Sequence, residues 1–74
     1  ITVNQNLSQI TIKNGVVENT SSADAIIVNS GVNEFVIDNV TTKRAKRGIF
    51  VDTAYNGHIT HCTMNLNTTG IEIN

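Results

Sequence analysis

Two carboxylates near the end of the chain are spaced so that they could act together as an acid and a base. Asp52 closes the motif Ile49–Asp52, and Glu72 lies inside the similar motif Ile71–Asn74. If the two motifs form neighbouring strands, the carboxylates are offset diagonally and their Cα atoms lie about 8 Å apart. Inverting glycosidases hold their carboxyl groups roughly 6.5 to 9.5 Å apart. Asp52 and Glu72 are therefore catalytic candidates, although two solvated acids would give the same pattern.

A second set of residues has the chemistry of a ligand-binding face. Phe50 lies on the same expected strand face as Asn29 and the two carboxylates, and the basic run 43–47 precedes this face. An aromatic ring beside cationic side chains suits an anionic glycan. A solvated loop or a nuclear-localisation or nucleic-acid patch would explain the basic run as well. The ligand-binding candidates are Asn29, Arg44, Lys46, Arg47 and Phe50.

The segment His58–Cys62 contains residue types that bind metals, but their expected directions do not converge. With Ile59 facing inward on a strand, His58 faces outward, His61 lies at a bend and Cys62 turns toward the core. Zinc needs ligands that meet at one point. We therefore expect no metal site and no cofactor, and we interpret Cys62 as a small core residue.

These residues sit within a repeating pattern of short strands. The sequence apolar, variable, apolar, Asn or Asp occurs four times, and a second motif follows each of the first three copies by about ten residues. The repeat length of roughly 22 to 25 residues lies in the range of solenoids. The strands are β-branched, alternate with period two and leave no room for helices. The pattern predicts an all-β, parallel β-helix of about three coils, and the family resemblance given below implies that the coil is right-handed.

The coil boundaries follow from the repeats. We expect one β-helix segment over residues 1–74, with coils at about 1–24, 25–47 and 48–69 and a partial coil at 70–74. The chain opens in mid-pattern, so we expect an excerpt of, or a stacking unit for, a longer solenoid. The predicted first turns are 5–8, 30–33 and 55–57, and the longest loop is 18–24.

Alternation along each strand predicts which side chains form the core. Asn14 and Asn39 should stack at equivalent bends, each amide bonding the next, and His61 should interrupt this ladder in the third coil. The predicted inward residues are Ile1, Val3, Ile12, Val17, Ile26, Val28, Phe35, Ile37, Ile49, Val51, Ile59, Met64, Ile71 and Ile73.

The stretch Asp24–Asn39 resembles the coil consensus of right-handed β-helix, pectin-lyase-like proteins, which include polysaccharide-acting enzymes and phage tailspikes. The resemblance implies a carbohydrate-binding or polysaccharide-processing module, extracellular or on a virion surface, and any enzyme would be a polysaccharide hydrolase or lyase. The paired-Asp and Gly-His-Gly signatures of polygalacturonases are incomplete here, as is the calcium-binding acid set with a catalytic Arg of pectate lyases. The alternative function is a purely structural, self-associating β-solenoid without catalysis.

The net charge and the strand ends limit which partners we expect. The net charge is −1, which argues against a dedicated nucleic-acid binder, and no apolar run is long enough for a membrane span. The terminal motifs present unpaired strand edges without charged or proline-bearing caps. We expect a glycan partner and either a homo-oligomer or neighbouring β-helix coils.

Overall fold

The computed structural model describes residues 1–18 and 22–74, and these residues form strands, turns and bends. The predicted loop 18–24 lies partly outside the described residues. None of the described residues forms a helix that could cross a membrane. The strands are β1 (Thr2–Val3), β2 (Ser8–Glu18), β3 (Ile26–Val28), β4 (Asn33–Lys43), β5 (Arg47–Val51), β6 (Tyr55–Thr60), β7 (Thr63–Asn65) and β8 (Thr69–Ile73).

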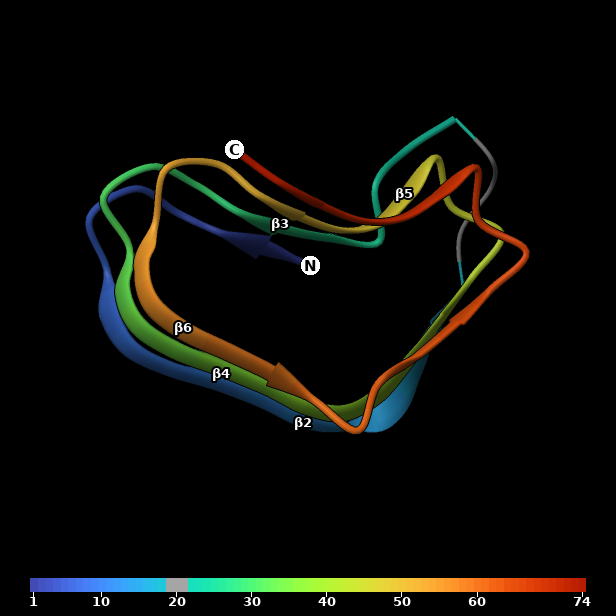
Figure 1. Ribbon diagram of the computed structural model, residues 1–74, viewed down its shortest axis with the longest axis horizontal. Helices are drawn as coiled ribbons and strands as arrows, with labels where there is room; N and C mark the ends of the chain where they lie inside the picture. Colours follow the sequence, from blue (N-terminus) through green and yellow to red (C-terminus); the bar gives the residue numbers. More distant parts are fainter. Residues whose placement is uncertain (19–21) are drawn as a thin grey trace.

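The strands pair in parallel into two sheets on opposite sides of a coil. One sheet has the order β1-β3-β5-β8 and the other β2-β4-β6, with β7 also pairing with β4. Figure 1 shows the coils stacked along the line of sight, with the chain running anticlockwise as it approaches the viewer, so the coil is right-handed. The predicted parallel β-solenoid of about three turns is confirmed.

Left-handed residues turn the long strands around the coil. Asn14 and Asn39 have φ values of 59° and 54° in the middle of β2 and β4, and Asn tolerates this conformation better than most residues. Both strands stay paired on either side of the bend, so each strand continues through it. His61, with φ 52°, occupies the equivalent place and separates β6 from β7.

A second column of left-handed residues lies near the start of the same sheet. Gln9, Glu34 and Asn56 have φ values of 57°, 60° and 53°, and each precedes a residue of the row Ile10, Phe35 and Gly57. Positive φ turns the backbone locally and breaks the strict alternation of side chains along the strand. Each coil therefore presents a polar side chain at this position.

The core consists of the predicted aliphatic columns and of residues from the corners. Most inward candidates of the middle coils are buried, including Ile26, Ile37 and Ile49. Ile1, Ile71 and Ile73, at the first and last strands of the described residues, instead remain 55%, 43% and 67% exposed. Six buried residues that we did not predict lie in the corners, in the last part of β4 after the bend, or near the start of β5: Ala25, Val32, Val40, Thr42, Ala45 and Gly48.

All differences in coil length lie at two corners. The register offset is 25 residues along β2 and β4, 23 along β3 and β5, and 22 from β4 to β6 and from β5 to β8. The third coil is one residue shorter before β6, so Tyr55 pairs with Asn33 at the start of a strand. Our prediction of a turn at 55–57 is therefore wrong, and the turn occupies 52–54.

Candidate functional site

The outward face of the sheet β1-β3-β5-β8 carries the predicted catalytic pair. Register places Glu72 directly beside Phe50, in the row that begins with Thr2 and Ile27. Asp52 follows Val51, whose partner is Ile73, so the two acids are offset diagonally on neighbouring strands. The carboxylate of Asp52 accepts a hydrogen bond of 3.1 Å from the hydroxyl of Thr53.

Arg47 lies at the start of β5 and makes most of the polar contacts on this face. Its guanidinium donates two hydrogen bonds of 2.8 Å to the carboxylate of Asp24 and one of 3.3 Å to Glu72. Its Cζ also lies 3.7 Å from the centroid of the Phe50 ring, within the range of a cation–π contact. The structure thus brings together Arg47 and Phe50, both predicted to bind a ligand. The two side chains cover part of each other's surface, however.

Asp24 was not among the sequence-based candidates, although its position in the repeat marks it. It precedes Ile26 by two residues, as Arg47 precedes Ile49, so opposite charges occupy the same slot on adjacent coils. The hydrogen bonds from Arg47 lower the pKa of Asp24, outweighing the opposite effect of burial. The side chain of Asp24 is 9% exposed and that of Arg47 23%. This bidentate, partly buried pair holds the two coils together at the start of the sheet.

The loop formed by the basic run 43–47 is shorter than predicted. Lys43 and Arg47 belong to β4 and β5, so only 44–46 lie between the strands. Arg44 forms an exposed ion pair of 2.8 Å with Glu18, whereas the main-chain amide of Lys46 donates to the carbonyl of Ala23 at 2.8 Å.

Asn29 also has a structural contact. Its side-chain amide donates to the carbonyl of Val3 at 3.1 Å, linking the first and second coils. Asn67 does the same for the second and third coils, bonding the buried hydroxyl of Thr42 at 2.9 Å and accepting from the amide of Ala45. Both asparagines stabilise corners by bonding main-chain groups of the preceding coil.

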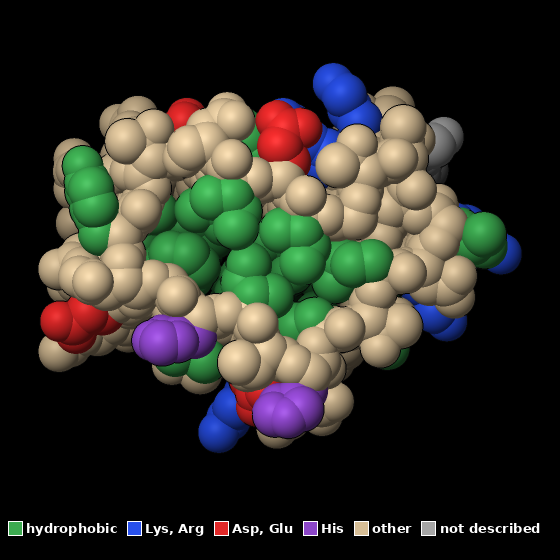
Figure 2. Space-filling model, in the orientation of Figure 1, with side chains coloured by type: hydrophobic (Ala, Val, Ile, Leu, Met, Phe, Trp, Pro, Cys, Tyr) green, Lys and Arg blue, Asp and Glu red, His purple; other side chains and the backbone are tan. Residues whose placement is uncertain are grey.

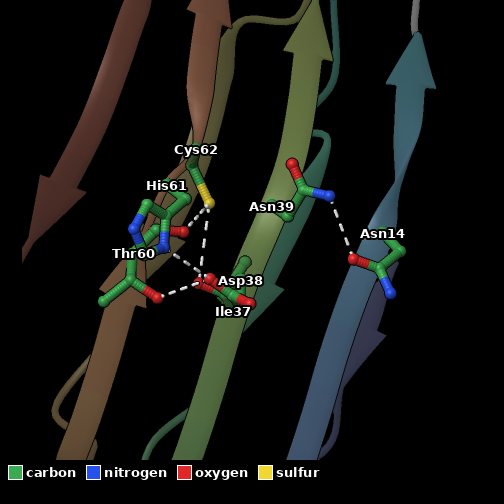
Figure 3. A network of polar contacts seen from close by, with 7 residues as sticks. All are labelled: Asn14, Ile37, Asp38, Asn39, Thr60, His61 and Cys62. Carbon is green, nitrogen blue, oxygen red and sulfur yellow. Dashed lines mark hydrogen bonds and ion pairs between the residues drawn. The ribbon is translucent and has the colours of Figure 1, made fainter.

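Figure 3 shows the bend at which the histidine and cysteine lie. Asp38 accepts a hydrogen bond of 2.8 Å from Thr60 and contacts Nδ1 of His61 at 3.0 Å. These contacts, with that from Thr60 the larger, lower the pKa of Asp38. The Sγ of Cys62 points to the carbonyls of Thr60 and Ile37, at 3.3 and 3.5 Å, and to no nitrogen of His61. The thiol is therefore not paired with a base.

The Asn ladder appears in the same view. The amide of Asn39 donates to the side-chain oxygen of Asn14 at 3.0 Å, as predicted, and His61 turns to Asp38 instead of extending the ladder. Within residues 1–18 and 22–74, no three His, Cys, Asp or Glu side chains form a group that could hold a metal ion.

The opposite sheet carries a polar hollow that sequence reasoning missed. It has a volume of about 420 Å³ and opens on the outer side of β2, β4 and β6. Two rows cross it, one of left-handed corner residues and one of outward strand residues, with apolar Ile10 and Phe35 between them. The sequence does contain a signal for this hollow: a polar residue recurs just before each member of the row Ile10, Phe35 and Gly57. The polar lining comprises Gln9, Thr11, Glu34, Asn56 and His58.

No protein-family model, curated protein or solved structure gives a significant match to this chain. The parallel β-solenoid is thus established by the structure alone, and the resemblance to pectin-lyase-like proteins stays a prediction.

Proposed function

We propose that this β-solenoid is a carbohydrate-binding module whose binding site is the hollow on the sheet β2-β4-β6. One observation carries the proposal: amide, carboxylate, hydroxyl and imidazole side chains from three successive coils line one hollow together with apolar Ile10, Phe35 and Val36. Concave sites with an apolar lining and a few placed polar groups are typical of small-ligand binding.

The chemistry of the lining favours a neutral glycan. Amides supply both donors and acceptors, and the carboxylate of Glu34 supplies only acceptors when ionised. This combination matches sugar hydroxyls, which donate and accept at each position. The hollow contains no Lys or Arg, so an anionic sugar would face Glu34 without a compensating cation. Rows that repeat with the coil spacing of about 4.8 Å suit an extended chain of similar units.

The other predicted binding and catalytic residues have a separate place in this proposal. Asn29, Phe50, Arg44, Lys46 and Arg47 would form a second contact region, for an anionic glycan. Asp52 and Glu72 would act there as acid and base if the module is a hydrolase or lyase, which requires Glu72 to leave Arg47. A glycan-directed role of this kind fits an extracellular or virion-surface location.

A glycan array followed by calorimetric titration tests the hollow. Asn56→Asp and Glu34→Gln change hydrogen-bonding groups while keeping side-chain size, and we expect each to weaken binding of a neutral glycan at least tenfold. Thr2→Ala on the opposite sheet serves as the matched control for Thr11→Ala within the hollow, and only the latter should weaken binding. Absence of binding, or equal effects of Thr2→Ala and Thr11→Ala, would overturn the proposal.

Activity is measured separately from binding. Release of reducing ends or unsaturated sugars that stops in Asp52→Asn and Glu72→Gln would support catalysis on the first sheet. Binding without any such release would leave a purely binding module. Loss of both binding and release across the array would favour the structural, self-associating solenoid.

The double variant Arg44→Ser with Lys46→Ser tests the anionic region. Cation contacts to a polyanion weaken with salt, so this variant should bind an anionic glycan less tightly and with a flatter salt dependence. If the salt dependence of binding is unchanged in the variant, Arg44 and Lys46 do not contact the glycan and belong to a solvated loop.

A further inference from the structure

The polar hollow on the sheet β2-β4-β6 is a groove, and the register of the strands gives its direction. Its lining comes from three neighbouring strand positions, each repeated from coil to coil. Because these rows cross the strands, the groove runs parallel to the solenoid axis, along the line of sight in Figure 1. The first flank is Gln9, Glu34 and Asn56, the second flank is Thr11, Val36 and His58, and the floor between them is Ile10 and Phe35.

The polar side chains of the flanks are available to a ligand. Asn56 donates a hydrogen bond of 2.8 Å to the side-chain oxygen of Asn33, which leaves its own side-chain oxygen as an acceptor. Figure 2 shows both histidine side chains, in purple, on the outer rim of the coil. The charged side chains of the opposite sheet, in contrast, bind one another. Four flank side chains make no hydrogen bond or ion pair with residues 1–18 or 22–74: Gln9, Thr11, Glu34 and His58.

We propose, building on the carbohydrate-binding function proposed above, that this groove binds a straight, unbranched, neutral glycan of β-1,4-linked pyranose units. The glycan lies parallel to the solenoid axis, with one unit per coil. Successive coils repeat each flank position about every 4.8 Å. A pyranose unit with equatorial 1→4 linkages has nearly this length, so successive units meet the flanks of successive coils.

The second flank matches the alternation within such a glycan. Successive rings of a β-1,4-linked chain are turned over. Along one side of the chain, an edge with two hydroxyls therefore alternates with an edge formed by the ring oxygen and C5. The second flank is polar at Thr11, apolar at Val36 and polar again at His58. The hydroxyl edges of the outer units face Thr11 and His58, and the less polar edge of the middle unit faces Val36.

The first flank is complementary to the opposite edges of the same three units. The middle unit turns its two hydroxyls to Glu34, whose ionised carboxylate only accepts hydrogen bonds. The outer units turn their ring oxygens to Gln9 and Asn56, whose side-chain amides can donate. Both flanks thus match the same placement of the glycan.

A glycan that lies along the strands fits less well. Such a chain meets the flanks of only one coil, at two positions that are two residues apart, and its next units leave the groove. A curved α-1,4-linked glycan also leaves a straight groove after one or two units. The arrangement of the flanks therefore favours a straight chain along the axis.

Calorimetric titration with glycans of defined length and shape tests the proposal. The straight probes are the β-1,4-linked trisaccharides of glucose, mannose, xylose and N-acetylglucosamine, each compared with its monosaccharide. Maltotriose is the matched control for cellotriose, because it contains the same sugar and the same number of units but is curved. We expect at least one straight trisaccharide to bind about tenfold more tightly, or better, than both its monosaccharide and maltotriose.

Variants in two different coils test whether one glycan spans them. Gln9→Ala in the first coil and His58→Ala in the third should each weaken binding of that trisaccharide about three- to tenfold, as expected for one lost hydrogen bond. Gln5→Ala and His61→Ala are the matched controls, since both residues are exposed and lie outside the hollow, and they should not change the affinity. Circular dichroism checks that each variant keeps its strands.

If a variant does not fold, nuclear magnetic resonance of the wild-type chain decides instead. The bound trisaccharide should shift the amide signals of residues 9–11, 34–36 and 56–58 together, and shifts confined to one coil would contradict the axial arrangement.

The outcomes separate this inference from the proposed function. If no neutral glycan binds, the proposed function fails, and the inference fails with it. Two results leave the function intact and overturn the axial arrangement alone. One is that maltotriose or the monosaccharide binds as tightly as the straight trisaccharide. The other is that only one of Gln9→Ala and His58→Ala weakens binding.

Discussion

Single side chains of this solenoid act mainly between coils rather than within them. Arg47 contacts an acid from the coil before it and an acid from the strand after it, and its guanidinium covers an aromatic ring of its own strand. Contacts of this kind link successive coils in addition to the main-chain ladders. The pair with Asp24 is the most enclosed ion pair among the described residues.

Asp24→Asn should lower the free energy of unfolding by about 1.5 to 3 kcal/mol at pH 7, because it removes charged acceptors from a partly buried guanidinium. The pKa of Asp24 is lower in the folded chain than its ordinary value of 3.8. Its stabilising contribution is therefore present above that value and is lost as the pH falls through the folded pKa. Urea unfolding at several pH values measures both effects.

The matched control is Glu18→Gln, which removes the exposed ion pair with Arg44. Exposed pairs contribute about 0 to 1 kcal/mol, so this change should alter unfolding little at any pH. If Asp24→Asn and Glu18→Gln lose equal free energy of unfolding, the burial of Asp24 does not strengthen its ion pair.

Glycine at position 57 makes room for the ring of Phe35. A Cβ there would overlap that ring, which lies in the buried row below it. Gly57→Ala should therefore destabilise the chain by about 1 to 3 kcal/mol through overpacking. Gly15→Ala is the control, since a Cβ at Gly15 meets nothing within 4 Å, and it should be neutral or stabilise by about 0.4 to 1 kcal/mol. Thermal unfolding of the two variants provides the comparison, and a Gly57→Ala chain as stable as Gly15→Ala would contradict the packing argument.

At the scale of elements, the coil is shaped by columns of left-handed residues. The bend at Asn39 combines a positive φ with an amide bond to Asn14. The side chain and the backbone angle thus make separate contributions to the same corner. They can be separated by two substitutions at one position.

Asn39→Gly removes the amide bond but keeps an unstrained positive φ, whereas Asn39→Ala removes the bond and adds the cost of a left-handed residue with a Cβ. That cost is about 1 to 2 kcal/mol. We therefore expect Asn39→Ala to be less stable than Asn39→Gly by about that amount in chemical denaturation. Equal stability would mean that the bend relaxes to a negative φ.

Much of the strand structure could be predicted from the repeat, but the prediction fails at the corners. The four motifs gave the strand rows, the Asn bends and most of the buried columns, because period-two alternation holds there. It does not hold where φ is positive, so Val32 and Ala45 were missed as core residues, and Gln9, Glu34 and Asn56 were missed as one polar row. The turn at 55–57 was misplaced because the third coil is one residue shorter, which the motif spacing alone does not localise.

At the scale of the whole molecule, burial decreases from the middle coil toward both ends. Ile26, Val28, Val32 and Ile37 of the middle coil are almost inaccessible to solvent, whereas Ile1 and Ile73 at the ends are largely exposed. A solenoid with this distribution has one coil that is covered on both sides and two that are covered on one side.

Native-state hydrogen exchange should therefore show a gradient along the solenoid axis. The amides of β4 should exchange only through global unfolding, while those of β1 and β8 should exchange through local opening with a smaller free energy. Mass spectrometry of the exchanged peptides resolves these segments. Uniform protection across all strands would show instead that the three coils open only together.

The coils differ in length at only two corners, and these corners are therefore the places where the chain can be lengthened. The offsets of 25, 23 and 22 residues leave every ladder in register, because the extra or missing residues lie before β3, β5 or β6. Such corners can accept inserted peptides without shifting a strand, and the solenoid can thus serve as a frame for display. An epitope or reporter peptide placed between Thr53 and Ala54 would project from the side of the coil, and the same corner of each coil would give parallel insertion points spaced one strand apart.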